Sequence, residues 1–207
     1  MNKSVFILMA DYKTISSIAQ GLYKEKGSKF LAFVCPISSE REAKYLVDKY
    51  KTDYPAARHH CYAYRLEPLG EKFRSYDDGE PSGTAGKPIL NQLLANEITN
   101  TIAIVVRYSG GTKLGVSGLI TAYKKATIEA IRESTIIDKY IRNVYNVSFS
   151  YAEMPIIMKW IKKHRISIIK QDLNLNCQLE IEVRKIESEA VLNTCPRNII
   201  PKLLYTI

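Results

Sequence analysis

The loop that organises the chain reads Asp77-Asp78-Gly79-Glu80-Pro81-Ser82-Gly83-Thr84-Ala85-Gly86-Lys87-Pro88. Its glycines and prolines give the backbone a defined shape rather than a slack one. Apolar residues follow at helical spacing, at positions 89, 90, 93 and 94, so the loop is expected to open a helix with Thr84 as its N-cap. The N–H groups at such a helix start can bind an anion. The alternative is a tight turn that only enters the helix.

A second glycine-rich loop also lies directly before a helix. It reads Arg107-Tyr108-Ser109-Gly110-Gly111-Thr112-Lys113-Leu114-Gly115 and follows a buried strand expected over residues 101–108. The helix after it is expected to end near residue 134. Two lysine-bearing loops that each open a helix predict one composite surface at the same end of an N-terminal sheet.

Composition limits the classes of protein and partner. The chain has 207 residues, with 30 Lys and Arg against 21 Asp and Glu, a net charge of +9 that suits a polyanion such as RNA or an acidic protein. The cysteines Cys35, Cys61, Cys177 and Cys195 show no Cys-x-x-Cys spacing, so we expect reduced, buried thiols. The apolar run Val5–Ala10 is too short for a signal peptide or a membrane span. We therefore expect a cytoplasmic protein that does not bind a membrane.

Hydrophobic patterning predicts two α+β domains. In the first, strands are expected over 15–23 and 29–37, joined by a turn at 24–28, and over 59–66. Ser39 and Glu42 fit a capping box for a helix that Pro55 stops. The second domain is expected to contain strands over 144–149, 166–170, 177–184 and 201–207, with helices over 155–164 and 186–193. This is the ferredoxin-like order. We place the domains at 1–138, with a core at 15–135, and at 139–207.

No set of residues in the sequence is a complete catalytic site. A phosphate-binding P-loop fails because Pro81 and Pro88 occupy the positions of its first glycine and its hydroxyl residue. His59 and His60 are neighbours on a strand and point to opposite faces. One of them could bind a divalent ion with Asp77, Asp78 or Glu80, the alternative being a structural role. We assign no catalytic residue, metal or cofactor.

Three motifs resemble the YigZ/IMPACT family: Arg58-His59-His60-Cys61, residues 77–88, and Val106 to Gly115. The resemblance covers residues 15–135 and implies a first domain with the fold of the second domain of ribosomal protein S-five. The C-terminal part resembles the family's ferredoxin-like second domain. Together the two are similar to the last two domains of elongation factor G, which implies contact with RNA or the ribosome. The family's eukaryotic relatives regulate translation by competing for an activator of a stress kinase, through a region that we do not expect in this chain. Tyr76, Ser117 and Thr121 depart from the family's usual Ser, Gly and Arg or Lys.

We therefore expect a non-enzymatic protein that binds RNA or the ribosome in the control of translational initiation or elongation, with a protein of the translation machinery as a further partner. The alternative is a small-ligand hydrolase that uses the acidic loop 77–80, with a divalent ion. The residues expected to bind nucleic acid or another anion are Arg58, His59, Gly83, Thr84, Gly86, Lys87, Arg107, Tyr108, Gly110, Gly111, Lys113 and Gly115. Asp77, Asp78, Gly79 and Glu80 are expected to structure the loop or bind a partner. Arg107 has the alternative of a structural ion pair with Asp77 or Asp78. The oligomeric state is left open.

Overall fold

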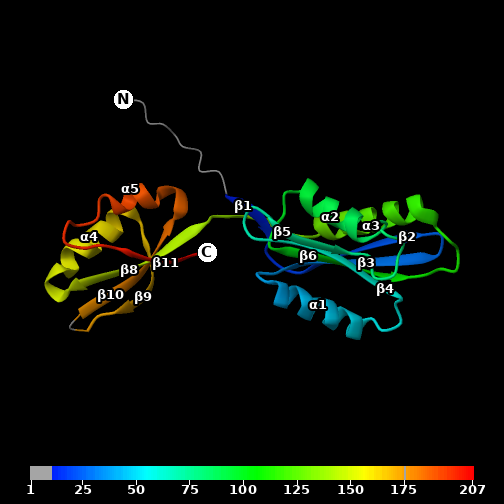
Figure 1. Cartoon of the computed structure of the whole chain (residues 1–207), viewed down its shortest axis with the longest axis horizontal. Helices are drawn as coiled ribbons and strands as arrows, with labels where there is room; N and C mark the ends of the chain where they lie inside the picture. The colour runs from blue at the N-terminus through cyan, green and yellow to red at the C-terminus, as the bar shows by residue number, and fades with distance from the viewer. Residues whose placement is uncertain (1–10, 175) are drawn as a thin grey trace, which may run out of the picture. The chain divides into compact units, whose positions relative to one another are not determined.

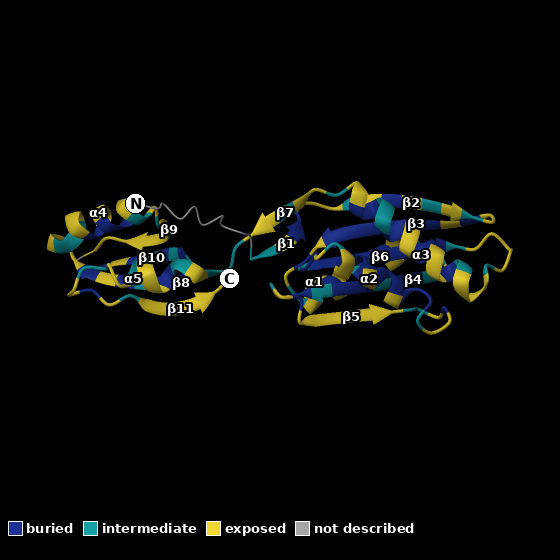
Figure 2. Ribbon diagram, turned by 90° about the horizontal axis from the view of Figure 1, so that it is seen from above, coloured by how far each residue is buried: buried dark blue, intermediate teal, exposed yellow. Residues whose placement is uncertain are grey.

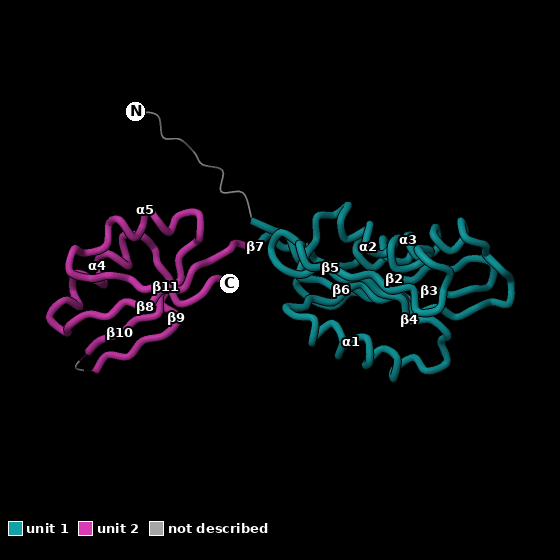
Figure 3. Tube along the Cα trace, in the orientation of Figure 1, with its two compact units in different colours: residues 1–139 teal, residues 140–207 magenta. Residues whose placement is uncertain are grey.

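The computed structural model describes residues 11–174 and 176–207, so the apolar run at 5–10 lies outside the described residues. The chain divides into two compact units, residues 1–139 and 140–207 (Figure 3). Among the helices of the described residues, none is both long enough and apolar enough to cross a membrane.

The N-terminal unit is built on a five-stranded antiparallel sheet with the order β2-β3-β6-β4-β5. The strands in that order are β2 (Ala19–Glu25), β3 (Ser28–Pro36), β6 (Thr101–Tyr108), β4 (His59–Leu66) and β5 (Lys72–Tyr76). β6 occupies the centre, as its nearly continuous apolar sequence predicts for a strand that is covered on both faces. Figure 2 shows β6 buried and the edge strand β5 exposed.

Helices cover both faces of this sheet (Figure 1). They are α1 (Glu40–Asp53) on one face, and α2 (Gly86–Ala95) and α3 (Gly115–Arg132) on the other. One apolar core, with Phe30, Ile89 and Tyr123, lies between the sheet and α2 and α3. The second core lies under α1 and contains Phe33 and Val47. Because Phe30 and Phe33 both belong to β3, this strand contributes to both cores, as its sequence predicts.

The strand predicted over residues 15–23 begins later, at Ala19, so the start of this prediction was wrong. The chain instead forms β1 (Tyr12–Ile15), bends at Ser16 and Ser17, and then forms β2. β1 pairs antiparallel with β7 (Ile136–Lys139), a segment for which no strand was expected. These two short strands form a separate two-stranded sheet.

The capping box expected at the start of α1 is only half formed. Ser39 Oγ accepts a hydrogen bond from the Glu42 N–H at 3.3 Å, as predicted. The Glu42 carboxylate, however, accepts from the N–H of Ser38 at 2.7 Å and not from that of Ser39. The helix ends at Asp53, two residues before Pro55.

The C-terminal unit is a four-stranded antiparallel sheet with two helices. Its elements are β8 (Arg142–Ser150), α4 (Met154–His164), β9 (Ser167–Asp172), β10 (Asn176–Arg184), α5 (Ser188–Leu192) and β11 (Lys202–Thr206), with short 3-10 turns η1 (Tyr151–Glu153) and η2 (Lys185–Glu187). The sheet order β11-β8-β10-β9 places the fourth strand beside the first and the third beside the second. This is the ferredoxin-like arrangement, and the predicted α+β class is confirmed.

Candidate nucleic-acid interface

The two glycine-rich loops leave the N-terminal sheet at the same end. His59, the first residue of β4, pairs with Arg107 near the end of β6, and Tyr62 of β4 pairs with Tyr76 at the end of β5. The loop after β5 therefore begins at the same end of the sheet as the loop after β6. The first leads into α2 and the second into α3, which lie on the same face (Figure 1).

The carboxylate of Asp77 binds the backbone at the start of α2. One oxygen accepts from the N–H groups of Ala85 and Gly86, at 2.9 and 2.8 Å, and the other from that of Gly83 at 2.9 Å. The N-cap residue of α2 is Ala85, so the prediction that Thr84 caps this helix was wrong. The Thr84 hydroxyl instead donates to the Pro81 carbonyl at 2.6 Å.

This capping removes the anion site expected at the first loop. The N–H groups of Gly83 and Gly86 already donate to the Asp77 carboxylate, which occupies the place of an external anion. Thr84 is only 2% exposed. An external phosphate would have to displace Asp77 from all three N–H groups. Lys87, by contrast, has an exposed side chain.

Asp78 joins the same loop to the start of β4. Its carboxylate accepts from the His60 N–H at 2.7 Å, and its carbonyl oxygen lies 2.8 Å from His59 Nδ1. Lys51 of α1 contacts the carboxylate at 3.5 Å. Gly79, at a φ of 86°, lies against the His59 imidazole. No group of three or more His, Cys, Asp and Glu side chains in the described part of the chain could hold a metal ion.

Glu80 and Arg107 form a buried ion pair that connects the two loops. Arg107 Nη1 donates to Glu80 Oε1 at 2.5 Å, and the Tyr123 hydroxyl of α3 donates to the same oxygen at 2.8 Å. Arg107 is 8% exposed. Its prediction as a nucleic-acid ligand was therefore wrong, because a buried and paired guanidinium cannot reach a phosphate. The structural alternative for Arg107 applies, with Glu80 as the partner instead of Asp77 or Asp78.

Cys61 lies beneath this pair and donates to the Tyr123 hydroxyl at 3.3 Å. Burial raises the pKa of the Cys61 thiol and that of the Tyr123 hydroxyl, so both stay protonated and can donate at neutral pH. A thiol held in this state is a poor nucleophile. The network of Glu80, Arg107, Tyr123 and Cys61 thus has the properties of a structural element rather than those of a reaction centre.

The second loop differs from the first because it is exposed and its helix start is uncapped. No side chain caps α3, whose N-cap residue is Leu114, and its first turn carries no acidic residue. Gly111 and Gly115 take φ values of 85° and 72°, which favour glycine. Tyr108 and Ser109 line a hollow of about 270 Å³ together with Gly111, Ala56 and Arg58.

The hairpin between β2 and β3 lies against this loop. The Gly110 N–H donates to Ser28 Oγ at 3.2 Å, and a Cβ added at Gly110 would lie 2.1 Å from the Gly27 carbonyl carbon. The hairpin brings Lys26 and Lys29 to the loop, and the Lys29 ammonium lies 5.9 Å from the centre of the Tyr108 ring. Sequence reasoning missed both lysines, although it had located the turn at 24–28.

Four exposed cations surround the second loop, and we name them the loop-end basic surface: Lys26, Lys29, Arg58 and Lys113. Two of them, Arg58 and Lys113, were predicted as anion-binding residues. His59 is only partly accessible, with 22% of its side chain exposed, and lies beneath the first loop. The structure thus separates the predicted site into an acidic loop whose carboxylates are bonded within the fold and an exposed basic surface.

Comparison with known proteins identifies relatives over most of the chain. Residues 26–131 match the family of the Impact N-terminal domain. An IMPACT family member from Haemophilus influenzae is 31% identical over 186 residues, covering 88% of this chain and 89% of the relative. The IMPACT family member YvyE from Bacillus subtilis is 29% identical over 183 residues, covering 88% and 84%.

A solved structure also matches residues of both units. A crystal structure described as that of a hypothetical protein superposes with a TM-score of 0.71 at 26% identity, covering 96% of this chain and 99% of the other. The family match includes both glycine-rich loops, the buried Glu80–Arg107 pair and all four cations of the loop-end basic surface. The chain belongs to the IMPACT family.

Proposed function

We propose that this protein binds RNA on the ribosome through the loop-end basic surface and takes part in the regulation of translation in the cytoplasm. The observation that carries the proposal is the group of four exposed cations around an uncapped helix start. Membership of the IMPACT family supports the link to translation, because the resemblance of the three sequence motifs to this family implies a role in the regulation of translation. A protein of the translation machinery is a further partner in this proposal.

The chemistry of the loop-end basic surface suits a phosphate backbone. Lysine and arginine side chains bind phosphates without reading sequence, and the N–H groups at the start of α3, which no side chain caps, favour an anion. The net charge of +9 adds a long-range attraction for a polyanion such as ribosomal RNA. Gly111 leaves the loop backbone open to a phosphate, because nothing lies within 4 Å of the position that a Cβ would take there.

The acidic loop favours binding over hydrolysis as the role of this chain. A hydrolase would need a carboxylate free to take a proton or hold an ion. Asp77 accepts three backbone hydrogen bonds, Asp78 contacts His60 and Lys51, and Glu80 binds Arg107 and Tyr123. Each carboxylate therefore already has a structural partner.

Cosedimentation with ribosomes across a salt series tests the proposal. Wild-type binding should fall steeply between about 50 and 200 mM salt, because each phosphate contact releases counterions. Replacing Lys29, Arg58 and Lys113 together with alanine should weaken binding and lower the slope of log K against log salt by about three.

A matched control removes the same charge elsewhere. Lys159, Lys162 and Lys163 are exposed on α4 in the C-terminal unit, and their triple replacement with alanine should leave the salt slope unchanged. Equal losses in the two triple variants would assign the effect to net charge and contradict the proposed surface. Wild-type protein that does not cosediment at low salt would contradict the function itself.

A further inference from the structure

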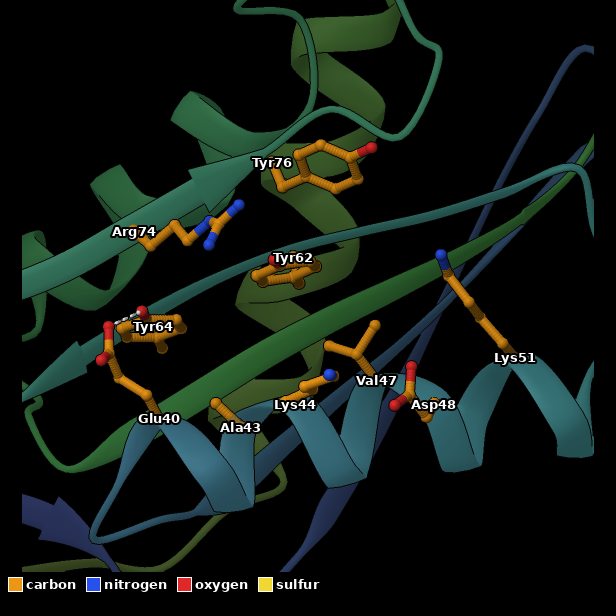
Figure 4. Close-up of a pocket in the computed structure, with 10 residues that line it drawn as sticks. All are labelled: Glu40, Ala43, Lys44, Val47, Asp48, Lys51, Tyr62, Tyr64, Arg74 and Tyr76. Carbon is orange, nitrogen blue, oxygen red and sulfur yellow. Dashed lines mark hydrogen bonds between the residues drawn. The ribbon is translucent and has the colours of Figure 1, made fainter.

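A pocket that the proposed function does not use lies on the face of the N-terminal sheet that α1 covers, between α1 and the strands β4 and β5 (Figure 4). Its volume is about 470 Å³, within the range of pockets that hold a small ligand. Its lining residues are Glu40, Ala43, Lys44, Val47, Asp48, Lys51, Tyr62, Tyr64, Arg74 and Tyr76. α1 does not cover β5, whose five residues are all exposed, so the pocket is open along this edge.

Aromatic rings form the wall of the pocket on the sheet side. Tyr62 on β4 is paired with Tyr76 on β5, and their ring centres are 5.5 Å apart at an angle of 40°. Tyr64 lies two residues along β4, with its ring nearly parallel to that of Tyr62 at 8°. Tyr64 is buried, whereas Tyr76 is 44% exposed and Tyr62 is partly buried, so Tyr76 and Tyr62 are the two rings that a ligand can reach.

Cations surround these rings. Arg74 is the cross-strand partner of Tyr64, and Lys44 projects from α1 on the other side of the rings (Figure 4). Within the part of the chain that the structure describes, neither Arg74 nor Lys44 forms an ion pair. Lys51 contacts Asp78 at 3.5 Å.

The two acidic residues of the pocket, Glu40 and Asp48, differ in whether they have partners. The Glu40 carboxylate accepts from the Tyr64 hydroxyl at 2.7 Å and pairs with Lys72 at 2.9 Å. Glu40 is therefore part of the wall, and its charge is compensated. Asp48 remains as an acceptor at the floor of the pocket on α1.

We propose that this pocket binds one unstacked nucleotide of a single-stranded RNA segment. The base stacks on Tyr62 and Tyr76, and the flanking phosphates contact Arg74 and Lys44. Base stacking on aromatic rings beside a basic track is the general mode by which proteins hold single strands. The inference rests on the proposed function, because it takes RNA as the ligand and assigns a second contact to it.

A peptide is the other ligand that tyrosine-lined grooves accept, in particular a proline-rich one. The charge of the pocket favours RNA over such a peptide. Arg74 and Lys44 flank the rings without an ion pair to any described residue, and a proline-rich segment without acidic residues would supply no partner to either of them.

Binding of two fluorescein-labelled probes, followed by anisotropy, tests the inference. One probe is a short oligouridylate, and the other is an abasic ribose-phosphate chain of the same length. Tyr76→Ala should weaken binding of the oligouridylate about tenfold and leave binding of the abasic chain unchanged, because only the base stacks on the ring. Arg74→Ala should weaken binding of both probes, since it removes a phosphate contact.

Phe73→Ala is the matched control. Phe73 is also an exposed aromatic residue of β5, at 62%, but strand alternation places it on the opposite face of the sheet from Tyr76. Its replacement should change neither affinity. Because Tyr76 and Phe73 lie on an exposed edge strand, both variants should keep the far-ultraviolet circular dichroism of the wild type.

Equal affinity of wild type and Tyr76→Ala for the oligouridylate would overturn the inference. The proposed function would survive that result if the triple variant of the loop-end basic surface still lost ribosome binding. Wild-type protein that binds no oligouridylate would also overturn the inference. Cosedimentation with ribosomes would still test the proposed function separately. A proline-rich peptide that binds wild type but not Tyr76→Ala, while the oligouridylate binds both equally, would assign the pocket to a peptide.

Discussion

Glu80 brings a negative charge into the interior of the N-terminal unit, where Arg107 compensates it. Glu80→Gln keeps an acceptor for the Tyr123 hydroxyl but leaves the buried guanidinium without a counter-charge. Breaking a buried pair in this way should lower the free energy of unfolding by about 3 kcal/mol. Urea unfolding followed by circular dichroism at neutral pH measures the change.

Two further variants make this prediction specific. Glu97→Gln removes an exposed carboxylate, 76% accessible, that pairs with Lys13, and it should have no measurable effect. Adding Arg107→Met to Glu80→Gln should recover part of the lost stability, because no charge then remains buried. An unchanged midpoint for Glu80→Gln alone would show that the ion pair does not stabilise the fold.

The residues of the two loops show how far the sequence alone predicts a site. It located both loops and Lys113, because glycines and lysines before a helix are a local pattern, and it singled out Arg58 through the family motif at 58–61. It assigned the cap of α2 to Thr84, since a threonine before a helical run is the usual signal. The actual cap, Asp77, reaches N–H groups six to nine residues ahead, a contact that depends on the complete shape of the loop.

At the scale of elements, β2 and α3 approach so closely that only glycine fits at position 21. A Cβ at Gly21 would lie 2.2 Å from the Ala130 nitrogen and 2.6 Å from the Glu129 carbonyl carbon, both backbone atoms of α3. Gly21→Ala must therefore separate the helix from the strand. We expect a loss of about 1–3 kcal/mol of stability, or more if α3 cannot shift.

Gly118→Ala is the control for this prediction. It adds the same methyl group within α3, where the nearest atom is the side-chain Cβ of Leu114 at 3.1 Å. The helix propensity of alanine offsets the tight contact, so its stability should stay within about 1 kcal/mol of wild type. Thermal unfolding compares the two variants. A Gly21→Ala protein as stable as Gly118→Ala would mean that the approach of β2 and α3 is not limiting.

The elements that the sequence predicted well are those whose pattern is local. β4 and β6 have their predicted bounds, because β6 is a nearly continuous apolar run and both strands end at turn residues. β1 and β7 were not predicted as a pair. Each has only four residues, and they are about 120 positions apart in the chain. Such short strands show no clear period, and their pairing depends on where the rest of the unit brings them.

At the scale of the whole molecule, each unit encloses its own apolar core. The single tryptophan of the chain, Trp160, lies in the C-terminal core at 5% exposure, and its indole N–H donates to Thr194 Oγ1 at 3.1 Å. Tryptophan fluorescence therefore reports unfolding of the C-terminal unit alone. Circular dichroism reports both units, with the larger share from the N-terminal one.

We predict that the two units unfold independently, because each completes its sheet and its core from its own residues. In urea, Glu80→Gln should move the main circular-dichroism transition to lower denaturant and leave the Trp160 fluorescence midpoint unchanged. Ile181→Ala, at a fully buried position of the C-terminal core, should do the reverse, with a loss of about 2–5 kcal/mol in the fluorescence transition. If either variant moved both transitions by the same amount, the chain would unfold as one cooperative unit. The Glu80–Arg107 ion pair would then stabilise the ferredoxin-like unit as well.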